Sequence, residues 1–320
     1  MRLAAAVIFC LMLCGEAAAQ TWPARPVRLM VAQSPGSAPD MVSRWVADRL
    51  AQSLGRSFVV ENILGSGGFV AAQTALRAGT SGYAYYLAGG GLIATDRHMY
   101  KSIPYDADRD FVPVAMLFDS GPFVVAVHPE VPARTLPELI SLAKSQPGKL
   151  TAASNAYGIT IITGQWFNAL AGTDIVNLTY KSTSQLVLDL LAGRVQMGFV
   201  GLADVDQHIK AGKTRALAVT SDARFPTYPE VHTVAETLPG FKVAGIGLLV
   251  APAGTPADIV QRLNRAIDPI VRDPKYTDYL LSFGWTNSAG ARTLAGLNEF
   301  MTSERERWND VFKVVHFEPQ

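Results

Sequence analysis

The chain has 320 residues, of which 49% are hydrophobic and 17% are charged, and its net charge is +1. A length of about 300 residues exceeds one compact core, so two domains are expected, with ample apolar material for both. The Lys and Arg residues are scattered rather than clustered, which argues against nucleic acid or an anionic membrane as a partner.

The first 20 residues are typical of a secretory signal peptide. Arg2 supplies the positive charge, residues 4–13 the apolar segment and residues 17–19 a small-residue cleavage site. Both cysteines, Cys10 and Cys14, lie in this segment, so no disulfide or thiolate metal site is expected after cleavage. Lipidation at Cys14 is an alternative, although the residue before it is a poor match to such processing. We expect a periplasmic protein, because no later apolar run is long enough to span a membrane.

The first elements predicted after the signal are a strand at 27–32 and a helix that begins near Pro39 and ends before Gly55. The turn between them, residues 34–40, reads Ser-Pro-Gly-Ser-Ala-Pro-Asp. A strand, a tight turn and a helix N-terminus place unpaired backbone N–H groups and the positive end of a helix dipole at one point, which suits an anion. Many turns of this composition bind nothing, so the turn alone leaves both interpretations open.

Two further strands are predicted at 58–60 and 83–88, and a glycine-rich turn follows each of them. Because the carboxyl ends of parallel strands meet at one edge of a sheet, these turns would lie beside the turn at 34–40. Gly68, Gly89 and Gly90 are therefore candidate ligand contacts.

A second series of elements comes next, and it predicts an α/β architecture with largely parallel sheets. Its strands are expected at 111–118, 123–127, 150–153, 175–178, 197–200 and 215–219, with helices starting after 135 and 184. The loop after the strand at 150–153 mirrors the opening turn. Lys181 and Ser182 come after another strand and could meet an anionic ligand, although an ordinary surface lysine is the alternative.

A strand at 246–250 and helices to about residue 315 are expected to return to the first domain. We therefore predict a signal peptide at 1–20, a discontinuous first lobe of residues 21–120 and 246–320, and a second lobe of residues 121–245.

Motifs for catalysis are mostly missing. The sequence has no histidine pair at metal-ligand spacing, no nucleophile elbow and no glycine motif for nucleotide phosphates. Ser141 and Lys144 match S-x-x-K, but the companion motifs of that set are absent. We expect no catalytic residue, metal or cofactor. The alternative is a secreted periplasmic hydrolase using Ser37, Ser154 or the Ser141/Lys144 pair, because a triad can be assembled from distant residues.

An ordered series of motifs runs through the chain, at residues 32–40, 60–68, 100–111, 180–181, 208–220 and 251–256. In this order and composition they resemble the tripartite tricarboxylate transporter substrate-binding proteins, the TctC-like or Bug receptors. The resemblance covers the chain from Trp22 to its C-terminus.

The resemblance implies a type II-like periplasmic binding protein fold, with two α/β lobes and a ligand cleft between them. It also implies a solute receptor that binds a small carboxylate and delivers it to an integral-membrane permease or reports it to a sensor, and we expect a monomer. One loop from each lobe would hold a carboxylate through backbone amides, hydroxyls and water. The corresponding positions are Gln33, Gly36, Ser37, Ala38 and Asp40 in the first lobe, and Ser154, Asn155, Tyr157, Gly158 and Thr160 in the second.

Several positions depart from the family pattern. Ala32-Gln33 stands where Pro-Phe is usual and Ser37 where a second Gly is usual. Ile161 stands at a common His, and Val200 at a frequent Asp. Loss of a potential His and of a carboxylate predicts a pocket with a more apolar far end. We therefore expect an aromatic or alkyl mono- or dicarboxylate in preference to an amino acid or citrate.

Overall fold

The computed structural model describes residues 22–155, 159–287, 289–315 and 317–319. The predicted signal peptide, with both cysteines, lies outside this part of the chain, and so do Tyr157 and Gly158. All the strands predicted from the sequence fall within the described residues.

The described strands form one mixed, nine-stranded sheet in the order β2-β1-β3-β9-β4-β7-β5-β6, with β8 paired to β4. Their bounds are β1 (Val27–Val31), β2 (Phe58–Asn62), β3 (Ala84–Ala88), β4 (Phe111–Val127), β5 (Thr151–Asn155), β6 (Val176–Tyr180), β7 (Met197–Gly201), β8 (Arg215–Val219) and β9 (Ala244–Pro252). We call β1, β2, β3, β9 and the start of β4 the first half, and the end of β4 with β5 to β8 the second half.

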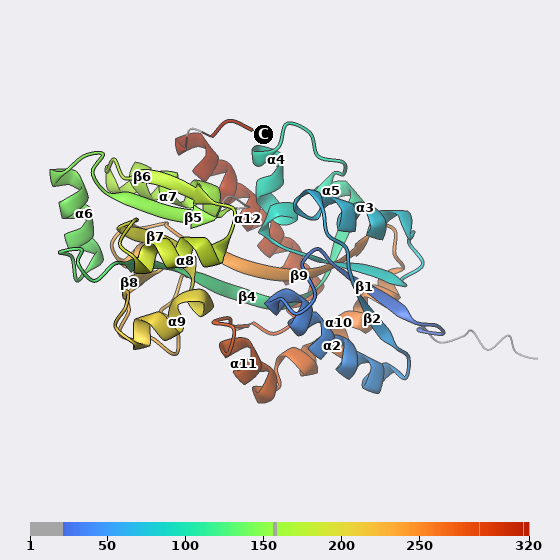
Figure 1. Cartoon of the computed structure of the whole chain (residues 1–320). Helices are drawn as coiled ribbons and strands as arrows, with labels where there is room; N and C mark the ends of the chain where they lie inside the picture. The colour runs from blue at the N-terminus through green and yellow to red at the C-terminus, as the bar shows by residue number, and fades with distance from the viewer. Residues whose placement is uncertain (1–21, 156–158, 288, 316, 320) are drawn as a thin grey trace, which may run out of the picture.

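The expectation of largely parallel sheets was wrong. The β1–β2, β1–β3, β5–β6 and β5–β7 pairs are parallel, but β3–β9, β4–β7, β4–β8 and β4–β9 are antiparallel. The cause is the way the chain passes between the halves. It leaves the first half along β4 and returns along β9, and these two strands pair with each other in opposite directions (Figure 1).

A break predicted near residue 120 is also absent, because β4 is a single strand. It pairs with β9 up to Pro122 and with β7 and β8 from residues 123–124 onward. Gly121 and Pro122 are typical turn residues, yet here they lie opposite Gly245 and Ala244 in the sheet. A Cβ on Gly121 would lie 2.9 Å from the Trp285 ring, so close packing, rather than a turn, requires glycine at this position.

Helices cover both faces of the two halves. Their bounds are α2 (Ala38–Leu54), α3 (Phe69–Arg77), α4 (Asp96–Met99), α5 (Ala107–Asp110), α6 (Leu136–Ser145), α7 (Thr160–Ala171), α8 (Thr183–Leu191), α9 (Leu202–Lys210), α10 (Ala257–Val271), α11 (Pro274–Leu281) and α12 (Leu294–Val314). The described residues also form two 3₁₀ turns, η1 (Ser66–Gly68) and η3 (Val234–Glu236), and a π-helix, η2 (Gly91–Thr95).

The first helix shows how local sequence sets these bounds. Pro39 lies in the first turn of α2, and Gly55 ends the helix with φ +69°, its N–H donating to the Ala51 carbonyl oxygen at 3.0 Å. Val42, Val46 and Leu50 recur on one face of this helix and are fully buried. The helix predicted from Pro39 to Gly55 is thus confirmed.

The apolar core of the described residues divides into three clusters. One lies between the first half and α2, α10 and α11, and another between the second half and α8 and α9. The third, which we call the shared core, contains residues of both halves together with α12. Within it, Trp308 of α12 lies 5.8 Å from Trp166 of α7, measured between ring centroids. The shared core therefore joins the two halves on the side that α12 covers (Figure 1).

Candidate functional site

Asp40 shapes the turn that connects β1 to α2. Its side chain is 2% exposed and accepts hydrogen bonds from the Gly36 N–H (2.9 Å), Asn62 Nδ2 (2.8 Å) and Arg44 Nε (3.0 Å). Burial would by itself raise the pKa of Asp40, but the bonds from Arg44, Gly36 and Asn62 outweigh it and hold the pKa below its usual value. Gly36 has φ +80°, a backbone conformation that favours glycine. The carboxylate of Asp40 is thus an internal anchor for the turn.

Ser37 immediately precedes α2, but its side chain makes no capping bond to the helix. Its Oγ is buried and has no hydrogen-bond partner among the described residues. The N–H groups of Ala38 and Asp40 lie in the first turn, where backbone donors have no intrahelical acceptor. This end of α2 therefore offers a hydroxyl and backbone donors to an anion.

The second loop connects β5 to α7 in a similar way. Ser154 is 2% exposed, and its Oγ likewise has no hydrogen-bond partner in the described part of the chain. Thr160 Oγ1 donates to the Asn155 carbonyl oxygen (3.0 Å), and Thr183 Oγ1 donates to Asn155 Oδ1 (3.2 Å). Asn155 thus ties the start of α7 to the start of α8, while Tyr157 and Gly158 of this loop lie outside the described residues.

The two loops share one unusual property. In each, a buried serine hydroxyl lacks a described partner, at Ser37 directly before α2 and at Ser154 near the end of β5, and the helix that follows lacks a side-chain cap. Leaving a buried polar group unpaired costs about 1–3 kcal/mol, so native proteins satisfy nearly all such groups. A ligand or ordered water that bonds to Ser37 and Ser154 would remove this cost.

The glycine-rich turns differ from each other in what they require. Gly68 has φ +105°, and a Cβ there would lie 2.6 Å from the Tyr86 hydroxyl, so this position is fixed by packing. A Cβ on Gly89 would meet only the Ile246 carbonyl oxygen at 3.8 Å, and one on Gly90 would meet nothing within 4 Å. Open space therefore lies in front of Gly90, directly before the π-helix η2, whereas Gly89 has ordinary contact with its neighbour. Short π-helices are frequent at functional sites.

The remaining predicted contacts lie in different surroundings. Gln33 is exposed, and its carbonyl oxygen accepts a bond from Asn62 Nδ2 at 2.9 Å. Lys181 is exposed, and Ser182 beside it caps α8 by accepting from the Gln185 N–H at 3.4 Å. Val200 has no exposed surface and packs within the second half. Ligand contact by these residues stays a prediction.

Sequence reasoning missed Asp96, which comes directly after η2. Its side chain is nearly buried and accepts a hydrogen bond from the Tyr105 hydroxyl at 2.8 Å. Burial raises the pKa of Asp96 to about 6, although the bond from Tyr105 acts in the opposite direction. Tyr105 lies in the Pro-Tyr-Asp motif, but nothing in the sequence shows which acid it contacts.

The described residues give three further observations. They contain no group of three or more His, Cys, Asp or Glu residues placed to hold a metal ion. Among the helices described, none combines the length and apolar character needed to cross a membrane. Ser141 and Lys144 are both exposed on α6.

Comparison with known proteins adds to this geometry. A family model described as "Tripartite tricarboxylate transporter family receptor" matches residues 42–316. A UPF0065 protein of Bordetella bronchiseptica is 33% identical over 305 residues, which covers 95% of this chain and 89% of that protein.

Two solved structures are similar along nearly the whole chain. "R. palustris Rpa4515 with adipate" has a TM-score of 0.79 at 30% identity and covers 93% of this chain and 100% of that one. MatC (Rpa3494) from Rhodopseudomonas palustris with bound malate has a TM-score of 0.74 at 27% identity and covers 91% and 100%.

Proposed function

From the premise that the chain belongs to the tripartite tricarboxylate transporter family of receptors, we propose that it binds a small carboxylate in the periplasm. It would deliver this ligand to an integral-membrane permease or report it to a sensor. The predicted cleaved signal peptide provides the route of export.

The observation that carries the proposal is the pair of buried hydroxyls, Ser37 Oγ and Ser154 Oγ, for which no described residue supplies a hydrogen-bond partner. Ser37 is the N-cap residue of α2, whereas Ser154 lies near the end of β5, the strand whose loop leads to α7, and α2 and α7 pack in different halves of the molecule. Backbone donors and the helix dipole can bind an anion without a guanidinium group. Arg44, the arginine bonded to Asp40, is occupied in shaping the first turn. A carboxylate held by both loops would favour the closed arrangement of the two halves, because only that state gives it both sets of contacts.

The apolar character of nearby positions supports an alkyl or aromatic acid as ligand. Ile161, in the first turn of α7, is half-buried against the shared core, and Val200, which is fully buried, brings no carboxylate to the end of β7. Rpa4515, which is 30% identical, has been solved with adipate, an unsubstituted alkyl dicarboxylate. We propose the same ligand class here, in preference to aspartate or citrate.

Receptor function is favoured over hydrolysis. A nucleophilic serine needs a base within hydrogen-bond reach, and neither Ser37 Oγ nor Ser154 Oγ has such a partner among the described residues. Ser141 and Lys144 are exposed on α6, and neither residue belongs to either loop.

A thermal-shift screen followed by calorimetry tests the proposal with adipate, benzoate, malate, citrate and aspartate. A ligand present at about 100 times its Kd should add about 2.7 kcal/mol of stability. We expect the largest effects from adipate or benzoate. Tight binding of aspartate or citrate, with no binding of the alkyl and aromatic acids, would contradict the proposed ligand class.

Serine variants identify the site. Ser37→Ala and Ser154→Ala should each weaken binding about tenfold, because each removes a hydrogen bond to a charged group. Ser141→Ala, at an exposed position on α6, is the matched control and should bind normally. Recovery of the ligand chemically unchanged after prolonged incubation separates a receptor from a hydrolase.

A further inference from the structure

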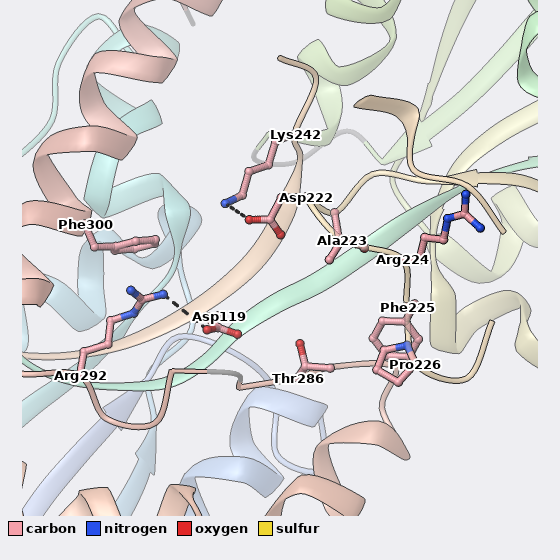
Figure 2. Close-up of a pocket in the computed structure, with 11 residues that line it drawn as sticks. Asp119, Asp222, Ala223, Arg224, Phe225, Pro226, Lys242, Thr286, Arg292 and Phe300 are labelled. Atoms are coloured by element: carbon pink, nitrogen blue, oxygen red, sulfur yellow. Dashed lines mark hydrogen bonds and ion pairs between the residues drawn. The ribbon is translucent and has the colours of Figure 1, made fainter. Parts of the chain in front are cut away.

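A cavity of about 230 Å³ lies where β4 and β9 carry the chain between the two halves (Figure 2). Its walls come from β4, the loop after β8, the segment before β9, the loop before α12 and α12 itself. It shares no lining residue with the predicted carboxylate site. We call it the crossing cavity.

Arg292 is poorly satisfied in this cavity. Its Nε is buried without a hydrogen-bond partner in the described part of the chain, and its terminal nitrogen lies 3.5 Å from Asp119 Oδ2, too far for a good hydrogen bond. The guanidinium carbon lies 5.1 Å from the centre of the Phe300 ring. A guanidinium group has five N–H donors, and the ion pair to Asp119 engages only part of them among the described residues, while 30% of the Arg292 side chain is exposed.

The backbone of Arg292 is also strained, with φ +59°, although the residue is not glycine. Asn264 helps to hold this conformation by donating from Nδ2 to the Arg292 carbonyl oxygen at 3.0 Å. Backbone strain concentrates at functional sites, and a buried donor without a protein partner needs a water molecule or a ligand to accept its hydrogen bond. Their coincidence at one arginine that lines a cavity is the reason to consider a ligand there.

The other cationic side chains of the cavity differ in whether they have N–H donors left to bind a ligand. Lys242 Nζ contacts Asp222 at 2.8 Å and retains further N–H donors. Arg224, by contrast, makes two bonds to Glu236, at 2.9 and 2.7 Å, and points away from the centre of the cavity in Figure 2. Arg292 and Lys242 approach the same space from opposite walls, with Phe300 beside them (Figure 2).

We propose that the crossing cavity is a second binding site, for a small organic carboxylate. The planar carboxylate would accept bonds from the guanidinium fork of Arg292 and from Lys242 Nζ. The apolar body of the ligand would lie against the rings of Phe300 and Phe225, both of which line the cavity. This site is separate from the one formed by Ser37 and Ser154, and the proposal of a second site does not depend on the proposed function.

The location gives the second site a structural consequence. Phe225 lies in the loop after β8 and Lys242 in the segment before β9. Arg292 precedes α12, and Phe300 lies within it. An occupant would therefore touch segments from both sides of the crossing strands.

Benzoate is the probe, and backbone amide NMR of the full chain is the readout. Saturable shifts of the amides at 222–225 and 286–292 report the crossing cavity, and those at 36–41 report the first site. We expect Arg292→Gly to weaken the response of the cavity amides at least tenfold and to leave the response at 36–41 unchanged. Because glycine adopts φ +59° without strain, this variant should remain folded.

Lys242→Met removes the cation on the opposite wall and should also weaken the benzoate-induced shifts of the cavity amides. Arg262→Met removes one charge from an exposed position of α10 and is the control, with no change expected at either set of amides. Benzoate shifts confined to 36–41, or cavity shifts that survive Arg292→Gly, would overturn the proposal. Inorganic phosphate binding at the cavity more tightly than benzoate would overturn the assignment to an organic acid. Loss of the response at 36–41 alone would count only against the first site.

Discussion

Asp40 and Asp96 are both nearly buried acids of the first half, but their surroundings shift their pKa values in opposite directions. The carboxylate of Asp40 accepts three hydrogen bonds from donors around it, whereas that of Asp96 accepts one, from Tyr105. Burial therefore dominates at Asp96, and hydrogen bonding dominates at Asp40. The two residues accordingly affect stability in opposite directions as the pH changes.

Asp40→Ala should destabilise the protein by about 2–3 kcal/mol, because it leaves buried donors of the first turn without an acceptor. The lowered pKa of Asp40 means that its stabilising effect is present at neutral pH and is lost below about pH 4, as the folded-state carboxyl takes up a proton. Urea unfolding at pH 7 measures the loss. Asp48→Ala, at an exposed position of the same helix, should cost much less. Equal losses for the two variants would contradict the anchoring role of Asp40.

Asp96→Asn should have the reverse effect. A folded-state pKa of about 6, above the usual value near 4, means that ionised Asp96 costs stability at neutral pH. That cost, about 3 kcal/mol at most, disappears as the pH falls from about 6 to about 4. The variant should therefore be more stable than the wild type at pH 8, and the difference should shrink at pH 4.5. Unfolding free energies at the two pH values test this, and a constant difference would argue against the raised pKa.

At the scale of elements, two glycines near the predicted site have different reasons to be glycine. At position 68, glycine is required by the φ of +105° and by the nearby Tyr86 hydroxyl. Gly90, in contrast, has an ordinary helical φ of −57° and open space in front of it. The first is a requirement of the fold. The second leaves room at the start of η2 for something other than protein.

Gly68→Ala should destabilise the fold by about 2 kcal/mol or more, since a side chain there is both strained and crowded. Gly90→Ala should leave the melting temperature nearly unchanged but weaken carboxylate binding, if the open space in front of Gly90 holds ligand. Melting curves and calorimetry on both variants separate the two effects. Unchanged adipate and benzoate binding in Gly90→Ala would remove this glycine from the site.

The elements also show what the sequence could and could not reveal. Local signals such as Pro39 and Gly55 gave the position of α2 well, because a helix start and stop depend on neighbouring residues. The sequence did not reveal that β4 is one continuous strand, because Gly121 and Pro122 are turn formers in isolation. Only the Trp285 ring explains the glycine. The crossing cavity was not foreseen either, since its walls come from segments far apart in the chain.

Across the whole molecule, the shared core is the feature that makes the two halves one unit. Trp166 belongs to the second half, and it contacts Trp308 of α12 and stacks on Phe241 at 4.6 Å between ring centroids. Because this apolar cluster is continuous, we expect the wild type to unfold in one cooperative transition.

Trp308→Ala should cost about 3–5 kcal/mol, as expected for truncation of a large buried ring. Because the removed ring joins the halves, the variant should also unfold less cooperatively. Calorimetry measures both, through the melting temperature and the ratio of van't Hoff to calorimetric enthalpy. Val314→Ala, at a position of α12 that is 50% exposed, is the control and should change neither. A sharp single transition in Trp308→Ala would show that the halves are coupled by other contacts.

The crossing strands have a consequence for the integrity of the chain. In many two-domain proteins the connecting segments are exposed linkers, where proteases cut first and amide hydrogens exchange quickly. Here both connections, β4 and β9, are hydrogen-bonded to each other inside the sheet, and most of their residues are buried. Limited proteolysis should therefore trim surface loops without releasing either half, and the amides of β4 and β9 should be among the slowest to exchange with deuterium.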